Sequence, residues 1–121
     1  MKDNLIKDKS FAFALRTVKL YKYLAFEQKE FILSKQILKS GTSVGANVEE
    51  ACSAQSKKEF IAKLNISLKE GKETHYWLRL LHFGEYIDKK MFDSMIADCD
   101  EIISILTAII KSTNKNLECK I

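Results

Sequence analysis

The sequence contains no proline and only four glycines among its 121 residues. A β-sandwich or β-barrel needs many tight turns, and proline and glycine supply most of them. Their scarcity therefore argues against a turn-rich β fold. Alanine, leucine, lysine and glutamate are plentiful instead, and these residues favour helix.

Cysteine is also scarce, because the chain has only Cys52, Cys99 and Cys119, an odd number at distant positions. That pattern does not fit a disulfide framework and predicts thiols in a reducing cytoplasm. The opening stretch MKDNLIKDKS lacks the apolar segment of a signal peptide. The longest apolar run, IISILTAII, is about half the length of a membrane span. We therefore expect a cytoplasmic protein that does not cross a membrane.

Arginine is the rarer of the two strong bases: Arg16 and Arg79 are the two arginines among 20 basic residues, and the net charge is +4. Lysine meets a phosphate as a mobile point charge rather than as a bidentate fork. Any contact with nucleic acid should therefore favour the phosphate backbone over base edges.

The spacing of apolar residues predicts one domain over residues 1–121, with helices at about 3–26, 33–54, 57–83 and 89–112 and a tail at 113–121. Ser56 and Glu59 have capping-box spacing at the start of the third helix, and Gly84 is expected to end it. Asp88 is the expected N-cap of the fourth. In the first helix the expected core stripe is Phe11, Leu15, Val18 and Tyr21, with Phe13, Leu20 and Leu24 on a neighbouring flank.

One stretch of the second predicted helix, SGTSVGAN at residues 40–47, looks at first like a glycine-rich ligand loop. No Gly-Lys-Ser/Thr follows it and no predicted strand precedes it, so a phosphate-binding loop is not indicated. The apolar phase is also the same before, through and after it, which predicts one continuous helix despite a cost of about 1 kcal/mol per interior glycine. The positions that keep this phase are Leu33, Ile37, Gly41, Val44, Val48 and Ala51.

The second helix has small residues on two sides, and the third has apolar residues on two sides. A helix that is apolar on two sides is typically buried on two sides, which predicts self-association. A broad core stripe with a few exposed apolar residues is the alternative. The residues expected at helix or subunit contacts are Gly41, Gly45, Ala46, Ile66, Trp77 and Leu80.

The residue pattern offers no catalytic or metal-binding constellation. Neither His75 nor His82 stands in the Glu-x-x-His motif of di-iron bundles, and Cys-x-x-Cys spacing is absent. Cys52 and Cys99 fall on predicted core stripes, where thiols are normally inert. Glu73 lies near apolar positions, so we expect it to pair with a cation such as Arg79 or to lie at a subunit boundary. We predict no enzyme activity, no metal and no cofactor.

Basic residues gather on the second and third predicted helices. A solvated charged face is the simplest interpretation for a monomer. In a ring of identical subunits each lysine is repeated, which would create a surface for a polyanion. The candidate nucleic-acid-binding residues are Lys35, Lys39, Lys57, Lys58, Lys63 and Arg79.

Nearly the whole chain, and most strongly Leu33 to Leu81, closely resembles the bacterial four-helix bundle proteins known as 23S ribosomal RNA intervening sequence proteins. The most specific segments are SGTSVGAN-EEA, AQSKKEF and KE-KETHYWLRLL. The resemblance implies a cytoplasmic bundle that assembles into rings of five. The chain is also similar to the accessory variability proteins of diversity-generating retroelements, which bind nucleic acid and a reverse transcriptase through a basic ring surface.

The family motif falls on small, polar and acidic residues, and the resemblance assigns none of them a catalytic role. Lys39 stands where many relatives carry arginine, which argues against base-specific readout. The motif residues are Ser40, Gly41, Ser43, Gly45, Asn47, Glu49 and Glu50 in the second helix, and Glu70, Glu73, Trp77 and Arg79 in the third.

Together these observations predict an all-α protein, an antiparallel up-down-up-down four-helix bundle that assembles into a homopentameric ring. The expected function is non-enzymatic binding of RNA or another nucleic acid through lysines. The alternative is a protein-interaction scaffold that docks a partner protein without touching nucleic acid.

Overall fold

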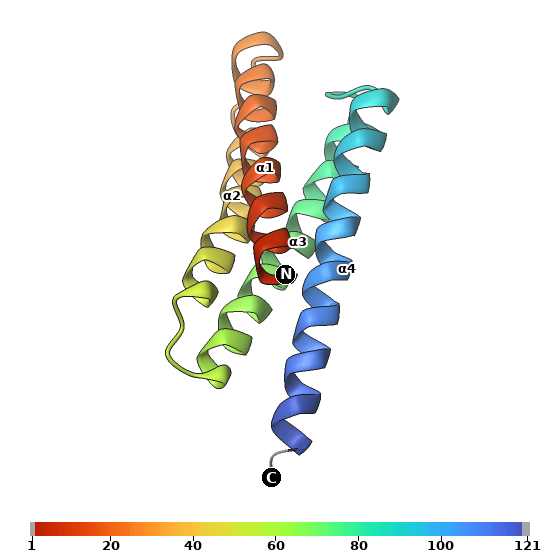
Figure 1. Cartoon of the computed structure of the whole chain (residues 1–121). Helices are drawn as coiled ribbons and strands as arrows, with labels where there is room; N and C mark the ends of the chain where they lie inside the picture. Colours follow the sequence, from red (N-terminus) through yellow and green to blue (C-terminus); the bar gives the residue numbers. More distant parts are fainter. Residues whose placement is uncertain (1, 120–121) are drawn as a thin grey trace.

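The structure is a computed structural model that describes the backbone of residues 2–119 and the side chains of residues 5–115. Within that range the chain forms four α-helices and no strand, which confirms the all-α prediction (Figure 1). The helices are α1 (Lys2–Lys22), α2 (Leu33–Cys52), α3 (Lys57–Phe83) and α4 (Lys89–Cys119), and a π-helical turn, η1 (Tyr23–Glu27), follows α1.

Each helix packs against the next one in the chain, and α1 also contacts α4. All four helices contribute to a single cluster of buried apolar side chains. Its members include Ile6, Phe13, Leu20, Ile37, Val44, Val48, Leu64, Leu78, Leu81, Met95, Cys99, Ile102 and Leu106.

The prediction that α2 continues through both glycines is confirmed, because the helix is unbroken from Leu33 to Cys52. A Cβ atom on Gly41 would lie 2.6 Å from side-chain atoms of Thr17 in α1. A Cβ atom on Gly45 would lie 3.2 Å from the carbonyl oxygen of Ser10. The two glycines therefore let α1 approach the backbone of α2 closely.

Buried hydroxyl groups join α2 to α3, a feature that apolar periodicity did not reveal. Thr74 Oγ1 lies 2.8 Å from Ser40 Oγ, and Ser67 Oγ donates to the carbonyl of Val44 at 2.8 Å. Every buried side-chain nitrogen or oxygen among the described side chains has a hydrogen-bond partner. These small polar residues are thus part of the core.

Three predicted boundaries are corrected by the structure. The first helix changes to π-helix at Tyr23 and ends at Glu27, and α2 ends at Cys52 rather than residue 54. The fourth helix continues to Cys119, where the sequence analysis placed a tail from residue 113. No proline or glycine follows Ile110, so nothing in the sequence stops the helix there.

The predicted core face of α1 is wrong. Phe11 and Leu15 are exposed, and the buried side of the helix carries Ile6, Phe13 and Leu20. Both sides are apolar at helical spacing, and the true core side also contains Ser10 and Thr17, which weaken its apolar pattern. Periodicity therefore selected the wrong one of two similar stripes.

Two predicted helix caps are confirmed: Ser56 Oγ accepts from the Glu59 backbone N–H, and Asp88 Oδ1 accepts from that of Met91. The predicted end of α3 is also confirmed, because the helix ends at Phe83 and Gly84 is its C-cap, but the left-handed residue is not the glycine. Gly84 has an ordinary φ of −82°, and Glu85 takes the left-handed conformation with φ 68°. The Tyr86 N–H bonds to the Leu81 carbonyl and the Glu85 N–H to that of His82, which is a Schellman ending.

None of the described helices contains a segment long and apolar enough to span a membrane.

Candidate functional site

The paired glutamates of the family motif tie α2 to both of its neighbours. Glu49 lies 3.6 Å from the Nζ of Lys7 in α1, and Glu50 accepts a 2.8 Å hydrogen bond from Lys63 in α3. The bond to Glu50 and its charge raise the pKa of Lys63. Lys63, predicted to bind nucleic acid, is therefore already engaged in an ion pair.

The small polar residues of the motif are used within α2 or against α3. Ser43 Oγ donates to the Lys39 carbonyl at 2.6 Å, and Asn47 Nδ2 donates to that of Ser43 at 2.9 Å. With the Ser40–Thr74 bond and the close approaches at both glycines, these contacts give the most specific segment of the sequence a packing role.

The motif residues of α3 also contact one another. Glu73 accepts a 3.0 Å hydrogen bond from the indole Nε1 of Trp77, which corrects the expectation of a cationic partner. The guanidinium of Arg79 lies over the ring of Tyr76, 5.6 Å from its centroid. The carbonyl of Glu70 accepts from Thr74 Oγ1. Trp77 is half-buried.

In the described part of the chain, no group of three or more His, Cys, Asp or Glu residues could hold a metal ion. His75 Nε2 lies 3.2 Å from Asp100 of α4, and His82 stacks on Phe92. Burial, together with the charges of Asp100 and Asp98, raises the pKa of the Cys99 thiol to about 12. Cys99 therefore stays protonated at neutral pH and is a poor nucleophile.

Cys52 is exposed, which corrects its predicted place on the core stripe. It is the last residue of α2, where the helix ends before the turn to α3. The side chain of Cys119 lies outside the described side chains.

The predicted basic residues do not form one patch. Along α2 and α3 the contacts run from Ser40–Thr74 through Val44–Ser67 to Glu50–Lys63. Lys35, Lys39 and Arg79 therefore belong to one end of this helix pair. Lys57, Lys58 and Lys63 belong to the other end, and all six side chains except that of Lys63 are exposed.

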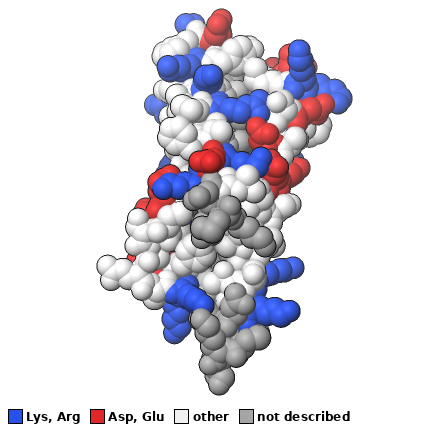
Figure 2. Space-filling view, in the orientation of Figure 1, with Lys and Arg blue, Asp and Glu red and all other residues white. Residues whose placement is uncertain are grey.

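Two further lysines lie at the second end, and neither was among the predicted binding residues. Gly71 of α3 is level with Cys99 and Ile103 of α4, so the start of α3 is level with the last turns of α4. This brings exposed Lys111 and Lys115 to the level of Lys57 and Lys58. In the view of Figure 2, basic side chains lie at the lower end of the molecule and most of the acidic side chains lie above them. We call these four lysines the basic end. The absence of proline and glycine after Ile110 was the sequence signal that the fourth helix continues and carries Lys111 and Lys115 to this end.

The outer side of α1 and α2 carries a groove of about 360 Å³. Its floor consists of small residues, and the exposed ring of Phe11 and the carboxylate of Glu49 stand beside it. Ala14, Thr42, Gly45 and Ala46 provide the floor. We call this the α1–α2 groove.

The outer side of α3 carries a row of exposed apolar side chains. Ile66 is 43% exposed, Tyr76 46% and Leu80 38%. We call these three residues the α3 ridge. The α1–α2 groove and the α3 ridge lie on different helices of the same chain.

The chain is similar to a known protein family and to a solved crystal structure. The family model described as 23S rRNA-intervening sequence protein matches residues 2–108. A crystal structure of a protein of unknown function from the S23 ribosomal protein family of Bacteroides thetaiotaomicron VPI-5482 superimposes with a TM-score of 0.90. The two sequences are 58% identical, and the match covers 92% of this chain and 99% of that one. No curated protein matches the chain.

Proposed function

This chain belongs to the 23S rRNA-intervening sequence protein family, and from that premise we propose that it is a non-enzymatic, homo-oligomeric protein that binds RNA or another nucleic acid through lysines. The observation that carries the proposal is the basic end. Its four lysines come from two helices, and they are exposed. Repeated around a ring, they would multiply the positive charge available to phosphates at this end, although Glu49, Glu50 and Glu59 also lie there.

The proposed subunit is an antiparallel up-down-up-down bundle. Contacts between α1 and α2 run from Lys7–Glu49 to Thr17–Gly41, and those between α1 and α4 run from Lys9–Glu101 to Arg16–Ser94. In each pair the residue number rises on one helix as it falls on the other. The α2–α3 contacts follow the same order.

The proposed assembly joins the α3 ridge of one subunit to the α1–α2 groove of the next. A contact between two different surfaces is heterologous and closes into a ring when the rotation between subunits allows it. What supports this contact is that the ridge exposes apolar side chains and that small residues line the groove. Five subunits are the number that the family resemblance implies.

The second candidate function is a scaffold that docks a partner protein. It is favoured by the end of the bundle opposite the basic end, where large apolar side chains are exposed. Ile32 is 73% exposed and Phe83 77%, and Phe26 and Phe31 are exposed beside them in the α1–α2 connection. A cytoplasmic location is part of both proposals.

The nucleic-acid proposal is tested by measuring the affinity for a structured RNA as a function of salt. Four phosphate contacts predict a log–log slope of about −3.6, which is a loss of about a hundredfold between about 50 and 200 mM salt. Absence of binding at about 50 mM salt, with assembly intact by light scattering, would refute the proposal.

Charge reversal separates the two candidate functions and locates the surface. Lys58→Glu with Lys111→Glu alters the basic end, and Lys35→Glu with Lys39→Glu alters the other group by the same charge. The basic-end variant should lose more RNA affinity, by more than about tenfold. Under the scaffold alternative, both variants retain their partner, and Phe26→Ser with Phe83→Ser loses it.

A further inference from the structure

A cavity of about 290 Å³ lies between α1 and α4, next to the π-helical turn. Figure 1 shows α1 and α4 diverging toward the end of the bundle that carries the α1–α2 and α3–α4 connections. The lining is mostly apolar and comes from the end of α1, the first residue of η1 and about one turn of α4. The cavity is lined by Arg16, Lys19, Leu20, Tyr23, Met91 and Met95.

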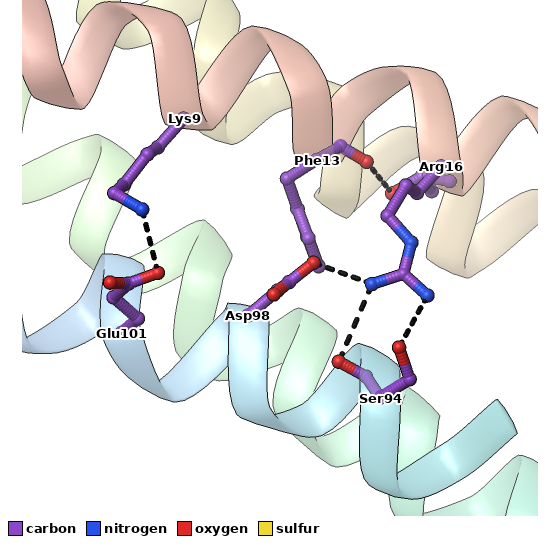
Figure 3. A network of polar contacts seen from close by, with 7 residues as sticks. Lys9, Phe13, Arg16, Ser94, Asp98 and Glu101 are labelled. Atoms are coloured by element: carbon purple, nitrogen blue, oxygen red, sulfur yellow. Dashed lines mark hydrogen bonds and ion pairs between the residues drawn. The ribbon is translucent and has the colours of Figure 1, made fainter. Parts of the chain in front are cut away.

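Polar contacts hold α1 to α4 at one border of this cavity. Arg16 donates to the carboxylate of Asp98 and to the carbonyl and hydroxyl oxygens of Ser94 (Figure 3). Further along, Lys9 pairs with Glu101 at 3.0 Å. Long polar side chains therefore bridge α1 and α4 from Lys9 to Arg16. The cavity lies beyond Arg16, where the side chains between the two helices are mostly apolar.

The charges around the cavity are unequal. Asp98 supplies one carboxylate, and it is already bound by Arg16. Lys19, one turn further along α1, is exposed and has no hydrogen bond or ion pair with any described side chain. A cation without a carboxylate partner at an apolar cavity favours an anion with an apolar body.

We propose that this cavity binds a small amphipathic carboxylate, with its apolar chain against Leu20, Met91 and Met95 and its carboxylate at Lys19. Methionine adapts its shape to different apolar partners, which suits a flexible alkyl chain. The cavity volume is at the lower end of the range for ligand pockets, so a short acyl chain fits better than a long one. This inference does not depend on nucleic-acid binding.

The test uses octanoate as the probe, with octanol and octylammonium as matched ligands that change only the head group. Labelling of the methionine methyl groups gives three NMR signals, because the chain has three methionines. Octanoate should shift the Met91 and Met95 signals in a saturable way, and octanol should bind more weakly. Octylammonium should bind most weakly, because its charge has the sign of Lys19 and Arg16.

Variants locate the anion contact. Lys19→Gln should weaken octanoate binding about fivefold and leave octanol binding unchanged. Lys22→Gln, which removes an exposed lysine outside the cavity lining, is the matched control and should have no effect. Met91→Trp, which fills the cavity mouth, should abolish binding of both, with helix content checked by circular dichroism.

Three results would overturn the inference. They are equal affinity for octanoate and octylammonium, equal loss of affinity in the two lysine variants, or octanoate-induced shifts that fail to saturate at Met91 and Met95. Either of the first two would mean that the cavity attracts alkyl chains without selecting an anion, and the third would mean that octanoate does not bind specifically in the cavity.

Discussion

At the scale of single residues, Glu30 combines burial with an unusual number of hydrogen bonds. Its side chain accepts from the backbone N–H groups of Ile32, Leu33 and Ser34, at distances from 2.7 to 3.3 Å, and Glu30 is only 9% exposed. Burial raises the pKa of Glu30, but these backbone bonds outweigh it and hold the pKa below its usual value of 4.5. The carboxylate therefore caps α2 in its ionised form.

Replacing Glu30 should make stability depend less on pH. Glu30→Gln should lower the free energy of unfolding by about 1–2 kcal/mol at pH 7, because the helix start loses an ionised acceptor. A lowered folded-state pKa adds stability above pH 4.5, and this is lost as the pH falls through the folded value. The difference between variant and wild type should accordingly shrink below pH 4.5 in urea titrations. Glu27→Gln, at an exposed site, is the control.

The ending of α3 predicts a stabilising substitution. Glu85 holds a left-handed conformation, which glycine adopts without steric cost. Glu85→Gly should therefore raise the free energy of unfolding by about 1 kcal/mol. Gly84→Ala should lower it, because the new Cβ would lie 2.8 Å from the Leu80 carbonyl oxygen. Thermal melts of both variants measure this, and a destabilised Glu85→Gly protein would contradict the assignment of the helix end.

At the scale of the helices, the contact between α1 and α2 depends on the absence of a side chain at Gly41. Gly41→Ala should lower the free energy of unfolding by about 1–2 kcal/mol, because overlap with Thr17 outweighs the gain in helix propensity. Adding Thr17→Ala removes the two atoms that the new Cβ would meet at 2.6 Å. A double-mutant cycle should therefore show favourable coupling between the two substitutions.

Gly71 in α3 is the matched control for this prediction. The nearest atom to a Cβ at that position is a side-chain carbon of Ile103, at 3.4 Å, which is an ordinary contact. Gly71→Ala should be neutral or stabilise the protein by up to about 1 kcal/mol through helix propensity. Equal destabilisation at both glycines would mean that close approach is not the reason for Gly41.

How far the sequence predicted each helix depended on how distinct its two sides are. The phase of α2 is clear because its outer side is polar or small, so its continuity through Gly41 and Gly45 was predictable. The face of α1 was not, since Phe11 and Phe13 lie on two stripes of similar hydrophobicity. The Glu30 cap was also missed, because its carboxylate serves a helix that starts three residues later.

At the scale of the whole molecule, the exposed apolar side chains of the α3 ridge predict assembly. If the wild-type protein assembles as proposed, Ile66→Asp with Leu80→Asp should convert that oligomer to monomer by light scattering, because charges would be buried at the contact. Helix content should remain, since both residues are exposed in the single chain. Ala97→Asp with Ala108→Asp adds the same charge at exposed positions of α4 and should leave the mass unchanged.

The candidate site itself was only partly predictable, because it depends on which helix ends come together. Sequence reasoning identified Lys57 and Lys58 but grouped them with Lys35 and Lys39, which belong to the other end of α2 and α3. Lys111 was placed in the last turn of the predicted fourth helix and Lys115 in the tail, and neither was predicted to bind nucleic acid. Only the pairing of the helices brings residues this far apart in sequence to one surface.

The hydroxyl groups between α2 and α3 bear on whether every copy of the chain presents its outer surfaces in the same relative position. A slide of one helical turn would break the Ser40–Thr74 bond and separate the buried Ser67 hydroxyl from the Val44 carbonyl, whereas purely apolar side chains would tolerate the slip. The buried hydrogen bonds therefore favour a single register of α2 against α3. With that register fixed, the α3 ridge and the α1–α2 groove keep the same relative position in every copy of the chain.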